Sequence, residues 1–357
     1  MIYATPSPDA DLRRRLADIA ALHSRIALNS PGSAPWSAPL RRQARIAAAR
    51  SSVSIEGFDV AFSTAAGIAT GLAVDRGDAE AQAYAAYAHA MHHVEVLADD
   101  PAFRWLDRVV LDLHFDVCAF QPAARPGRWR TTAVAVTAPG GMGLAYVGPS
   151  ADTVPALLDE VIDWLAGSED AMNPIIIAAM AHLHLVSIHP FRDGNGRLAR
   201  VAQALVLARG TGLPAELCSI EGSLAANTAG YYAALTAVQG GRYQPDRDAR
   251  SWIDFCLTAH LQQAADRVRL IERAAIRWAA LEQLVEQRGW PDRLVGALER
   301  AIDGGLDRMS YVRETEISIA TAAADLRRLV DAGLVTQHGR TRNTTYRASA
   351  ELQRLAG

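Results

Sequence analysis

Two apolar stretches joined by a short charged segment constrain the fold of this 357-residue chain most strongly. The first, residues 174–188, is too long for an ordinary strand and is typical of a buried helix. In the second, apolar residues recur at the spacing of one helix face: Leu198, Val201, Ala202, Leu205 and Ala208. We therefore expect two core helices with a tight junction between them, the second helix beginning near Gly194.

The start of this second helix has the properties of an anion site. The first turn of any helix offers backbone N–H groups without partners and the positive end of the helix dipole. Gly194 and Gly196 carry no Cβ, so a ligand can approach the backbone closely. Arg197 and Arg200 are three residues apart and share one helix surface. The pattern predicts a site for several phosphate groups.

Two further side chains add chemistry to this junction. Asp193 supplies a hard carboxylate oxygen, which Mg²⁺ uses beside substrate phosphates. His189, one loop away, can accept a proton from an incoming hydroxyl.

The twelve residues from His189 to Arg200 read His-Pro-Phe-Arg-Asp-Gly-Asn-Gly-Arg-Leu-Ala-Arg. They resemble the Fic family signature, His-Pro-Phe-x-Asp/Glu-Gly-Asn-Gly/Lys-Arg-x-x-Arg, at every specified position. The resemblance implies Mg²⁺-dependent transfer of AMP from ATP to a Ser, Thr or Tyr hydroxyl of a protein. It also implies a role for each residue: His189 as the base, Asp193 as the metal ligand, and Gly194, Asn195, Gly196, Arg197 and Arg200 as phosphate ligands. Family members that phosphorylate have lysine at the eighth position, so Gly196 favours nucleotidyl transfer.

A second segment resembles the inhibitory pattern of the same family, Ser/Thr-x-x-x-Glu-Gly/Asn. Ser52 and Glu56 are four residues apart, followed by Gly57, and share one helix face if the helix continues. The resemblance implies that Glu56, oriented by Ser52, restrains the activity. The chain repeats Ser-Ile-Glu-Gly at 219–222, but Leu217 replaces the required hydroxyl residue there. The alternative is that Glu56 is a solvated carboxylate at a helix end.

Residues 131–137 are rich in β-branched side chains, and after a turn at 138–141 the stretch 144–147 can return as a second strand. In Fic proteins the matching hairpin, called the flap, covers the nucleotide and docks the target by strand pairing. We therefore place Val134, Ala135, Val136 and Thr137 against the nucleotide. The alternative is a decorative loop.

A tandem tyrosine resembles the segment that lines the adenosine pocket in the family. On that basis Tyr231 and Gln239 are expected to contact the nucleotide. The alternative is that both belong to the core, where tyrosine is common.

Composition excludes several classes of protein. The chain has no lysine, which excludes a Walker A loop, a Schiff-base enzyme and a kinase-type catalytic lysine. The net charge of −3 gives no global sign of a nucleic-acid or membrane partner. Three scattered cysteines and the lack of a signal-peptide pattern predict a cytoplasmic protein without disulfides. His89 and His93 have the spacing of metal ligands on a helix, but we expect them to be histidines on the helix surface.

The expected fold is mainly α: a helical N-terminal segment with the inhibitory helix at 1–100, a Fic core with a β-hairpin flap at 101–260, and a winged-helix-like domain at 270–357. A helix is expected over 248–270, with a change of pattern near Glu272. The last part reads as helices followed by two strands. Arginines give it a modest basic side: Arg327, Arg328, Arg340, Arg342 and Arg347. This domain is predicted to bind DNA, or to dock a protein or a second copy of the chain.

The sequence thus leaves three functions open. The first is a protein adenylyltransferase autoinhibited by Glu56. The second is a de-AMPylating or bifunctional Fic enzyme, in which Glu56 orients a water. The third is a DNA-binding regulator whose Fic domain only senses nucleotide. The sequence does not identify the target protein, the modified residue or the oligomeric state, and it does not distinguish ATP from another nucleoside triphosphate.

Overall fold

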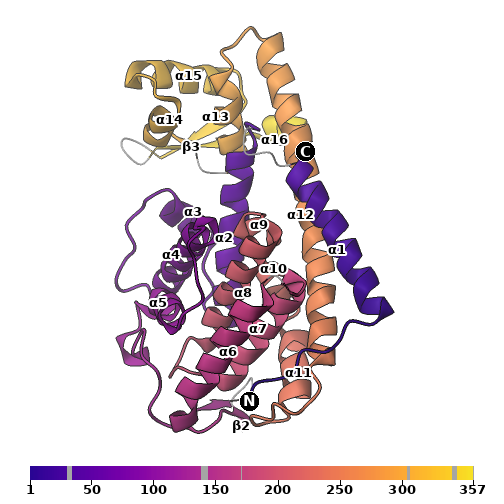
Figure 1. Cartoon of the computed structure of the whole chain (residues 1–357). Coiled ribbons are helices and arrows are strands. Elements are labelled where there is room, and N and C mark those ends of the chain that lie inside the picture. Colours follow the sequence, from indigo (N-terminus) through magenta and orange to yellow (C-terminus); the bar gives the residue numbers. More distant parts are fainter. Residues whose placement is uncertain (30–33, 138–143, 170, 304–305, 340–343, 357) are drawn as a thin grey trace. The chain divides into compact units, whose positions relative to one another are not determined.

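The computed structural model describes residues 1–29, 34–137, 144–169, 171–303, 306–339 and 344–356 (Figure 1). Backbone contacts divide the chain into two compact units. Unit 1 comprises Met1–Leu28, Ala44–Val60 and Val74–Val268, and unit 2 comprises Asn29–Gln43, Ala61–Ala73 and Arg269–Gly357. The expected division at 1–100, 101–260 and 270–357 stays a prediction.

Unit 1 is built around the two predicted core helices, α7 (Pro174–Ile188) and α8 (Asn195–Thr211). Helix α6 (Val154–Ser168) packs against α7, and the three helices lie side by side (Figure 1). Three more helices pack against α8: α4 (Ala79–Asp99), α5 (Asp107–Cys118) and α9 (Ala215–Cys218). The helical expectation is therefore confirmed.

Further short and long helices complete unit 1. These are α1 (Ala10–Asn29), the end of α2 (Ser37–Ile55), η1 (Pro122–Ala124), η3 (Ala151–Thr153), α10 (Glu221–Ala226), α11 (Thr228–Gln239) and the first part of α12 (Arg250–Gln287).

Local signals explain where α7 begins and why it is central. Asn173 caps it by accepting a hydrogen bond from the Ile175 amide at 3.0 Å, and Pro174 occupies the first helical position. Every residue from Ile175 to Ile188 is buried, as expected for a helix that is apolar on all sides. No helix in the described ranges has both the length and the apolar character to cross a membrane.

The predicted hairpin is present in unit 1 but is shorter than expected. Strand β1 (Ala135–Thr137) pairs antiparallel with β2 (Leu144–Val147), with Ala135 opposite Val147 and Val136 opposite Tyr146. The first half of 131–137 is not strand, because the carbonyl of Thr132 accepts a hydrogen bond from the Arg130 side chain. The expected turn at 138–141 lies outside the described residues. We call residues 131–137 and 144–149 the flap.

Helix α12 corrects the expectation of a change near Glu272, since it continues to Gln287. Nothing in the intervening sequence stops a helix, and the first helix breaker is Gly289 with φ +61°. Its last turns bury a regular apolar stripe in unit 2: Ile271, Ala274, Trp278, Leu281 and Val285.

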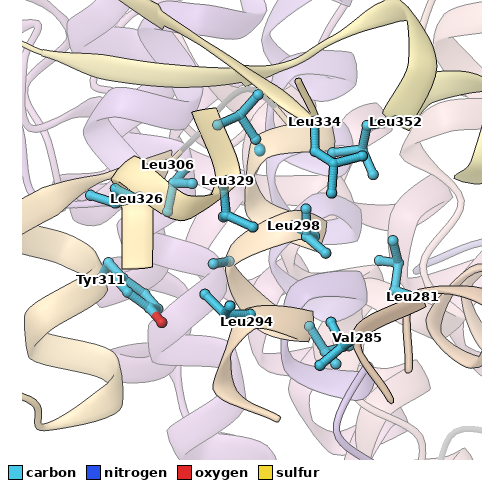
Figure 2. Packing of buried hydrophobic residues seen from close by; sticks show 14 of the residues in the cluster. Leu281, Val285, Leu294, Leu298, Leu306, Tyr311, Leu326, Leu329, Leu334 and Leu352 are labelled. Carbon is cyan, nitrogen blue, oxygen red and sulfur yellow. The ribbon is translucent and has the colours of Figure 1, made fainter. Parts of the chain in front are cut away.

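The rest of unit 2 is a set of short helices with a small sheet. The elements are α3 (Phe62–Ala69), α13 (Arg293–Ile302), β3 (Leu306–Asp307), α14 (Arg308–Thr315), α15 (Ile319–Asp331), β4 (Val335–His338), β5 (Thr345–Ala348) and α16 (Ala350–Ala356). The strand order is β3-β5-β4, with antiparallel neighbours. Leucines from α13, α15 and the segments beside the sheet meet in one core, which includes Leu298, Leu329, Leu334 and Leu352 (Figure 2).

Helices α14 and α15, followed by the antiparallel pair β4 and β5, agree with the order of elements expected for a winged helix. The assignment of a winged-helix domain stays a prediction. Arg327, Arg328 and Arg347 are exposed, while Arg340 and Arg342 lie outside the described residues. DNA binding and homodimer formation likewise stay predictions.

Candidate functional site

The junction between α7 and α8 takes a left-handed turn at each end. His189 closes α7 with φ +53°, and Gly194 precedes α8 with φ +79°. The first backbone hydrogen bond into α8 runs from the Leu198 amide to the Gly194 carbonyl at 2.9 Å. The amides of the three preceding residues therefore have no acceptor within the helix, which is the arrangement that the predicted anion site requires.

His189 has the tautomer of a base. Its Nδ1 lies 3.0 Å from the Val186 carbonyl, so Nδ1 carries the proton and Nε2 keeps its lone pair. Burial lowers the pKa of this imidazole, and this effect outweighs the hydrogen bond to the Val186 carbonyl, which raises the pKa; the charge of Arg130 lowers it further, while Glu56 and Asp193 oppose the shift. The side chain is therefore neutral near pH 7 and able to accept a proton.

The Asp193 side chain is 53% exposed at the mouth of the anion site. Its Oδ1 accepts a hydrogen bond from the Gly194 amide at 2.6 Å. Within the described residues no group of three or more His, Cys, Asp or Glu side chains could hold a metal ion. An exposed carboxylate beside a phosphate site fits Mg²⁺ that takes its other ligands from phosphates and water. Asp193 is thus suited to its predicted role.

Asn195 and Arg197 use their side chains to build the site. The Asn195 amide group accepts from the Phe191 N–H and donates to the Phe191 carbonyl, both at 2.9 Å, which closes the loop. The buried Arg197 donates to the Val117 carbonyl at 3.0 Å and to Gln121 Oε1 at 2.9 Å. Their direct contacts with phosphate stay predictions, and the structure assigns both side chains a supporting role.

Arg200 and the predicted inhibitory segment meet directly. Arg200 is 2% exposed and donates to Ser52 Oγ at 2.7 Å, to the Ser52 carbonyl at 3.1 Å and to Glu56 Oε1 at 2.7 Å. A Cβ added to Gly196 would lie 2.6 Å from Glu56 Oε1. The carboxylate of Glu56 therefore lies over the first turn of α8, where an anionic ligand would bind.

The electrostatics of this pair favour the charged forms. Burial opposes the ionisation of Glu56, but the charge and hydrogen bond of Arg200 outweigh it and lower the pKa of Glu56. The pKa of Arg200 is raised, because the charge of Glu56 outweighs the cost of burial. Glu56 is thus a carboxylate at neutral pH, held over the first turn of α8.

The wall behind the loop is rigid. His114 accepts a hydrogen bond from the Gly127 amide at 3.0 Å, donates to the Asp193 carbonyl at 2.9 Å and stacks on Phe191 at 3.5 Å between ring centres. Burial lowers the pKa of His114 to about 4, so the ring is neutral and both of its nitrogens are occupied. Cys118 fills the remaining space, since a Cβ on Gly194 would lie 2.2 Å from its sulfur.

The flap lies beside His189. A Cβ added to Gly148 would lie 2.9 Å from Val134 Cγ1 and 3.6 Å from His189 Cβ. On its other side β2 is covered, because the Val147 amide donates to the Gly241 carbonyl at 3.0 Å. β1 is thus the free edge, and both Ala135 and Thr137 are exposed on it.

The two residues expected at the adenosine lie in the core. Tyr231 is buried, and its hydroxyl lies 3.0 Å from His182 Nε2. Gln239 is also buried and donates to Ser187 Oγ at 2.9 Å. The neighbouring Tyr232 is half-buried and donates to the Ile55 carbonyl at 3.5 Å, beside Glu56. Nucleotide contacts by Tyr231 and Gln239 stay predictions.

Sequence reasoning missed the role of Arg130. This arginine was part of the segment before the flap, but nothing in its spacing distinguished it from Arg125 or Arg128. Its buried side chain donates to the carbonyl of His189 at 2.8 Å. A single arginine directly before a predicted strand gives no sequence signal for such a contact.

Comparisons with known proteins agree with this geometry. Residues 105–207 match the Fic/DOC family. The chain is 33% identical over 171 residues to protein adenylyltransferase fic-1 of Caenorhabditis briggsae, which covers 43% of this chain and 30% of the relative. It is 30% identical over 132 residues to protein adenylyltransferase Fic of Nematostella vectensis, covering 33% of this chain and 29% of the relative. The chain thus spans about 30% of the length of the curated relatives it matches.

Two solved structures share the fold. A Fic family protein from Desulfovibrio desulfuricans G20 aligns with a TM-score of 0.62 and 24% identity over 97% of this chain and 98% of its own. Fic-1 from C. elegans (residues 134–508) aligns with a TM-score of 0.57 and 23% identity, covering 73% of this chain and 72% of its own. The chain therefore contains a Fic/DOC domain, and its fold is shared beyond that domain.

The packing at Gly194 generates a stability prediction. Gly194→Ala adds a left-handed strain of about 1–2 kcal/mol and a clash with Cys118, for which overpacking costs roughly 1–3 kcal/mol. Gly212→Ala, at the other end of α8 with φ +66° and open space around its Cβ, adds only the strain. The free energy of unfolding, measured by urea denaturation, should fall more for Gly194→Ala than for Gly212→Ala.

A double variant isolates the clash. Cys118→Ala removes the sulfur that the new Cβ would meet, so in the Gly194→Ala background it should recover most of the difference from Gly212→Ala. If Gly194→Ala and Gly212→Ala lose the same free energy of unfolding, the loop before α8 can shift to accommodate the new Cβ, and the contact with Cys118 does not constrain it.

Proposed function

We propose that this protein transfers AMP from ATP to a Ser, Thr or Tyr hydroxyl of a protein, with Mg²⁺, and that Glu56 restrains the reaction. The observation that carries the proposal is the joint placement of a neutral His189, the amide end of α8 and the exposed Asp193 around one anion site. The curated relatives named as protein adenylyltransferases support it.

The proposed reaction assigns one step to each of these groups. The target hydroxyl gives its proton to His189 Nε2 while its oxygen attacks the α-phosphorus of ATP. The bond from the α-phosphorus to the bridging oxygen breaks, and pyrophosphate leaves with the electron pair. The amides at the start of α8 and the guanidinium of Arg200 stabilise the charge on the phosphate tail. Bound Mg²⁺, held by Asp193, would neutralise further charge on the phosphates.

Glu56 restrains this reaction by occupying the place of the phosphate tail. Its carboxylate uses the Arg200 donor and covers the first turn of α8. ATP must displace it or bind in a pose unsuited to in-line attack. A bias of about 2–3 kcal/mol against the productive pose gives roughly 10²-fold suppression.

The nucleotide and the direction of transfer are tested together. The purified protein is incubated with Mg²⁺ and each of ATP, GTP and UTP, and intact masses of the protein and of lysate proteins are measured. We expect a mass increase equal to AMP. No adduct from wild type or from the Glu56→Gly variant would overturn the proposal. Loss of AMP from a pre-modified protein would instead favour the reverse reaction.

The role of His189 is tested by His189→Asn. This substitution removes the base. Because asparagine tolerates the left-handed backbone of this position, the loop should keep its shape. Transfer of AMP should fall by about 10²–10⁴-fold, while the Kd for ATP should stay near the wild-type value because the phosphate ligands are intact. Both are measured, by mass spectrometry and by calorimetry. Near wild-type transfer would contradict the mechanism.

Glu56→Gly should raise auto-modification by roughly 10²-fold, because it frees Arg200 for the phosphate tail. The matched control is Asp59→Gly, which removes an exposed carboxylate three residues further along the chain and should change nothing. Arg200→Ala should not raise the rate, since it loses the restraint and the phosphate ligand together. An unchanged rate in Glu56→Gly, in a protein that is otherwise active, would show that Glu56 is not inhibitory.

Docking of the target on the flap is tested by Ala135→Pro. The Gly148 amide donates to the Val134 carbonyl, and strand groups alternate in direction, so the N–H of Ala135 points to the free edge of β1. Proline there removes an outward donor and leaves the hairpin bonds intact. Modification of a protein target should fall, and transfer to N-acetyl-threonine amide should not. Equal loss with both acceptors would mean that the flap serves only the nucleotide.

A further inference from the structure

Arg130 is a buried cation outside the recognised motifs, and its side chain binds only carbonyl oxygens. It is 5% exposed. Nη2 lies 3.4 Å from the Ile188 carbonyl, and three shorter bonds are made: Nε donates to the His189 carbonyl at 2.8 Å, Nη1 to the Thr132 carbonyl at 2.9 Å, and Nη2 to the Pro149 carbonyl at 2.6 Å. No carboxylate pairs with it in the described part of the chain.

These three carbonyls belong to three different segments. His189 ends α7 and carries the candidate base, Thr132 precedes β1, and Pro149 follows β2. The backbone amide of Arg130 also donates to the Pro190 carbonyl at 2.9 Å. One guanidinium thus joins both ends of the flap to the residue that carries the imidazole.

The hydrogen bonds from Arg130 stabilise the backbone at the C-terminal end of α7 in two ways. A helix C-terminus leaves carbonyls without partners, and a cation there is favourable. A non-glycine residue in the left-handed region costs about 1–2 kcal/mol, and the hydrogen bond from Arg130 helps to hold His189 in that conformation. Only a planar guanidinium offers donors in fixed, divergent directions; a lysine ammonium is a compact charge on a flexible stem.

We propose that Arg130 is a positioning residue that fixes the flap relative to His189, so that a hydroxyl presented on β1 lies within reach of Nε2. The proposal rests on the proposed function for its catalytic part. The link between flap and loop is a property of the fold and is tested separately. The uncompensated charge of Arg130 also supports the neutral state of the imidazole, since it lowers the pKa of His189.

The experiment compares Arg130→Met, Arg130→Lys and Arg128→Met. Arg128 is exposed two residues earlier, so its variant controls for loss of a cation near the flap. In Arg130→Met, kcat for protein modification should fall by about 10–100-fold, because small displacements of a reacting group have effects of this size. The KM for ATP should stay near wild type, since no ATP ligand is changed. Arg130→Lys should recover part of kcat, and Arg128→Met should match wild type.

A second measurement does not depend on activity. Hydrogen–deuterium exchange of the β1 and β2 amides should be faster in Arg130→Met than in Arg128→Met, with intermediate exchange in Arg130→Lys. Unchanged exchange and unchanged kcat in Arg130→Met would overturn the proposal. An equal loss of ATP affinity and kcat would also overturn it, because that result indicates general damage. If wild type transfers no AMP, the proposed function fails, and the exchange comparison alone decides whether Arg130 fixes the flap.

Discussion

The burial of a permanent positive charge at Arg200 is the constraint on which the site depends. A charge removed from water is costly unless it is paired and hydrogen-bonded. Ser52 and Glu56, about 150 residues earlier in the chain, supply that pairing, so the end of α2 must lie against α8. One guanidinium nitrogen, Nη1, is buried without a hydrogen bond and lies 3.3 Å from where a Cβ on Gly196 would be. The remaining donor thus adjoins the first turn of α8. A single ion pair therefore compensates the buried charge and also places the Glu56 carboxylate over that turn.

The repeated Ser-Ile-Glu-Gly shows that these four residues alone do not determine which carboxylate pairs with Arg200. Glu221, in the second copy, is also buried, and it lines a small gap beside Arg200 that has no room for a water molecule. It accepts a hydrogen bond from the Tyr87 hydroxyl at 3.1 Å and not from Arg200. Burial raises the pKa of Glu221, whereas the pairing with Arg200 lowers that of Glu56. Two carboxylates near one arginine therefore have opposite electrostatic characters. The hydroxyl residue four positions earlier, present as Ser52 and replaced by Leu217 in the repeat, is the local difference that separates them.

The sequence could predict those features that depend on interactions between residues close together in the chain. The α7–loop–α8 junction follows from apolar period, glycine positions and first-turn amides, and the hairpin follows from β-branched residues around a turn. What it could not predict was how a side chain divides its hydrogen bonds among distant partners. Asn195 closes its own loop on Phe191, Arg197 reaches the end of α5, and Tyr231 turns into the core toward His182. The end of α12 was missed for another reason. Its apolar positions continue without a break past Glu272, and the sequence alone does not show that the last turns of the helix pack into the core of unit 2.

Because the chain has no lysine, its long-range contacts from cationic side chains are all made by arginine. A lysine loses its charge readily when buried and presents one compact donor group, whereas an arginine stays charged and offers five donors in a plane. Arg130, Arg197 and Arg200 are all buried, and each spans separate pieces of backbone: the flap and His189, the end of α5, and the end of α2. Arg130 donates to backbone carbonyls, whereas Arg197 donates to the Val117 carbonyl and to Gln121 Oε1 and lies 3.6 Å from the Asp193 carboxylate, so both side chains hold separate segments together. Arg200 alone has a carboxylate at hydrogen-bond distance, and that carboxylate is on a helix end with a quarter of its side chain exposed. The carboxylate partner of Arg200 is therefore accessible to solvent at the first turn of α8.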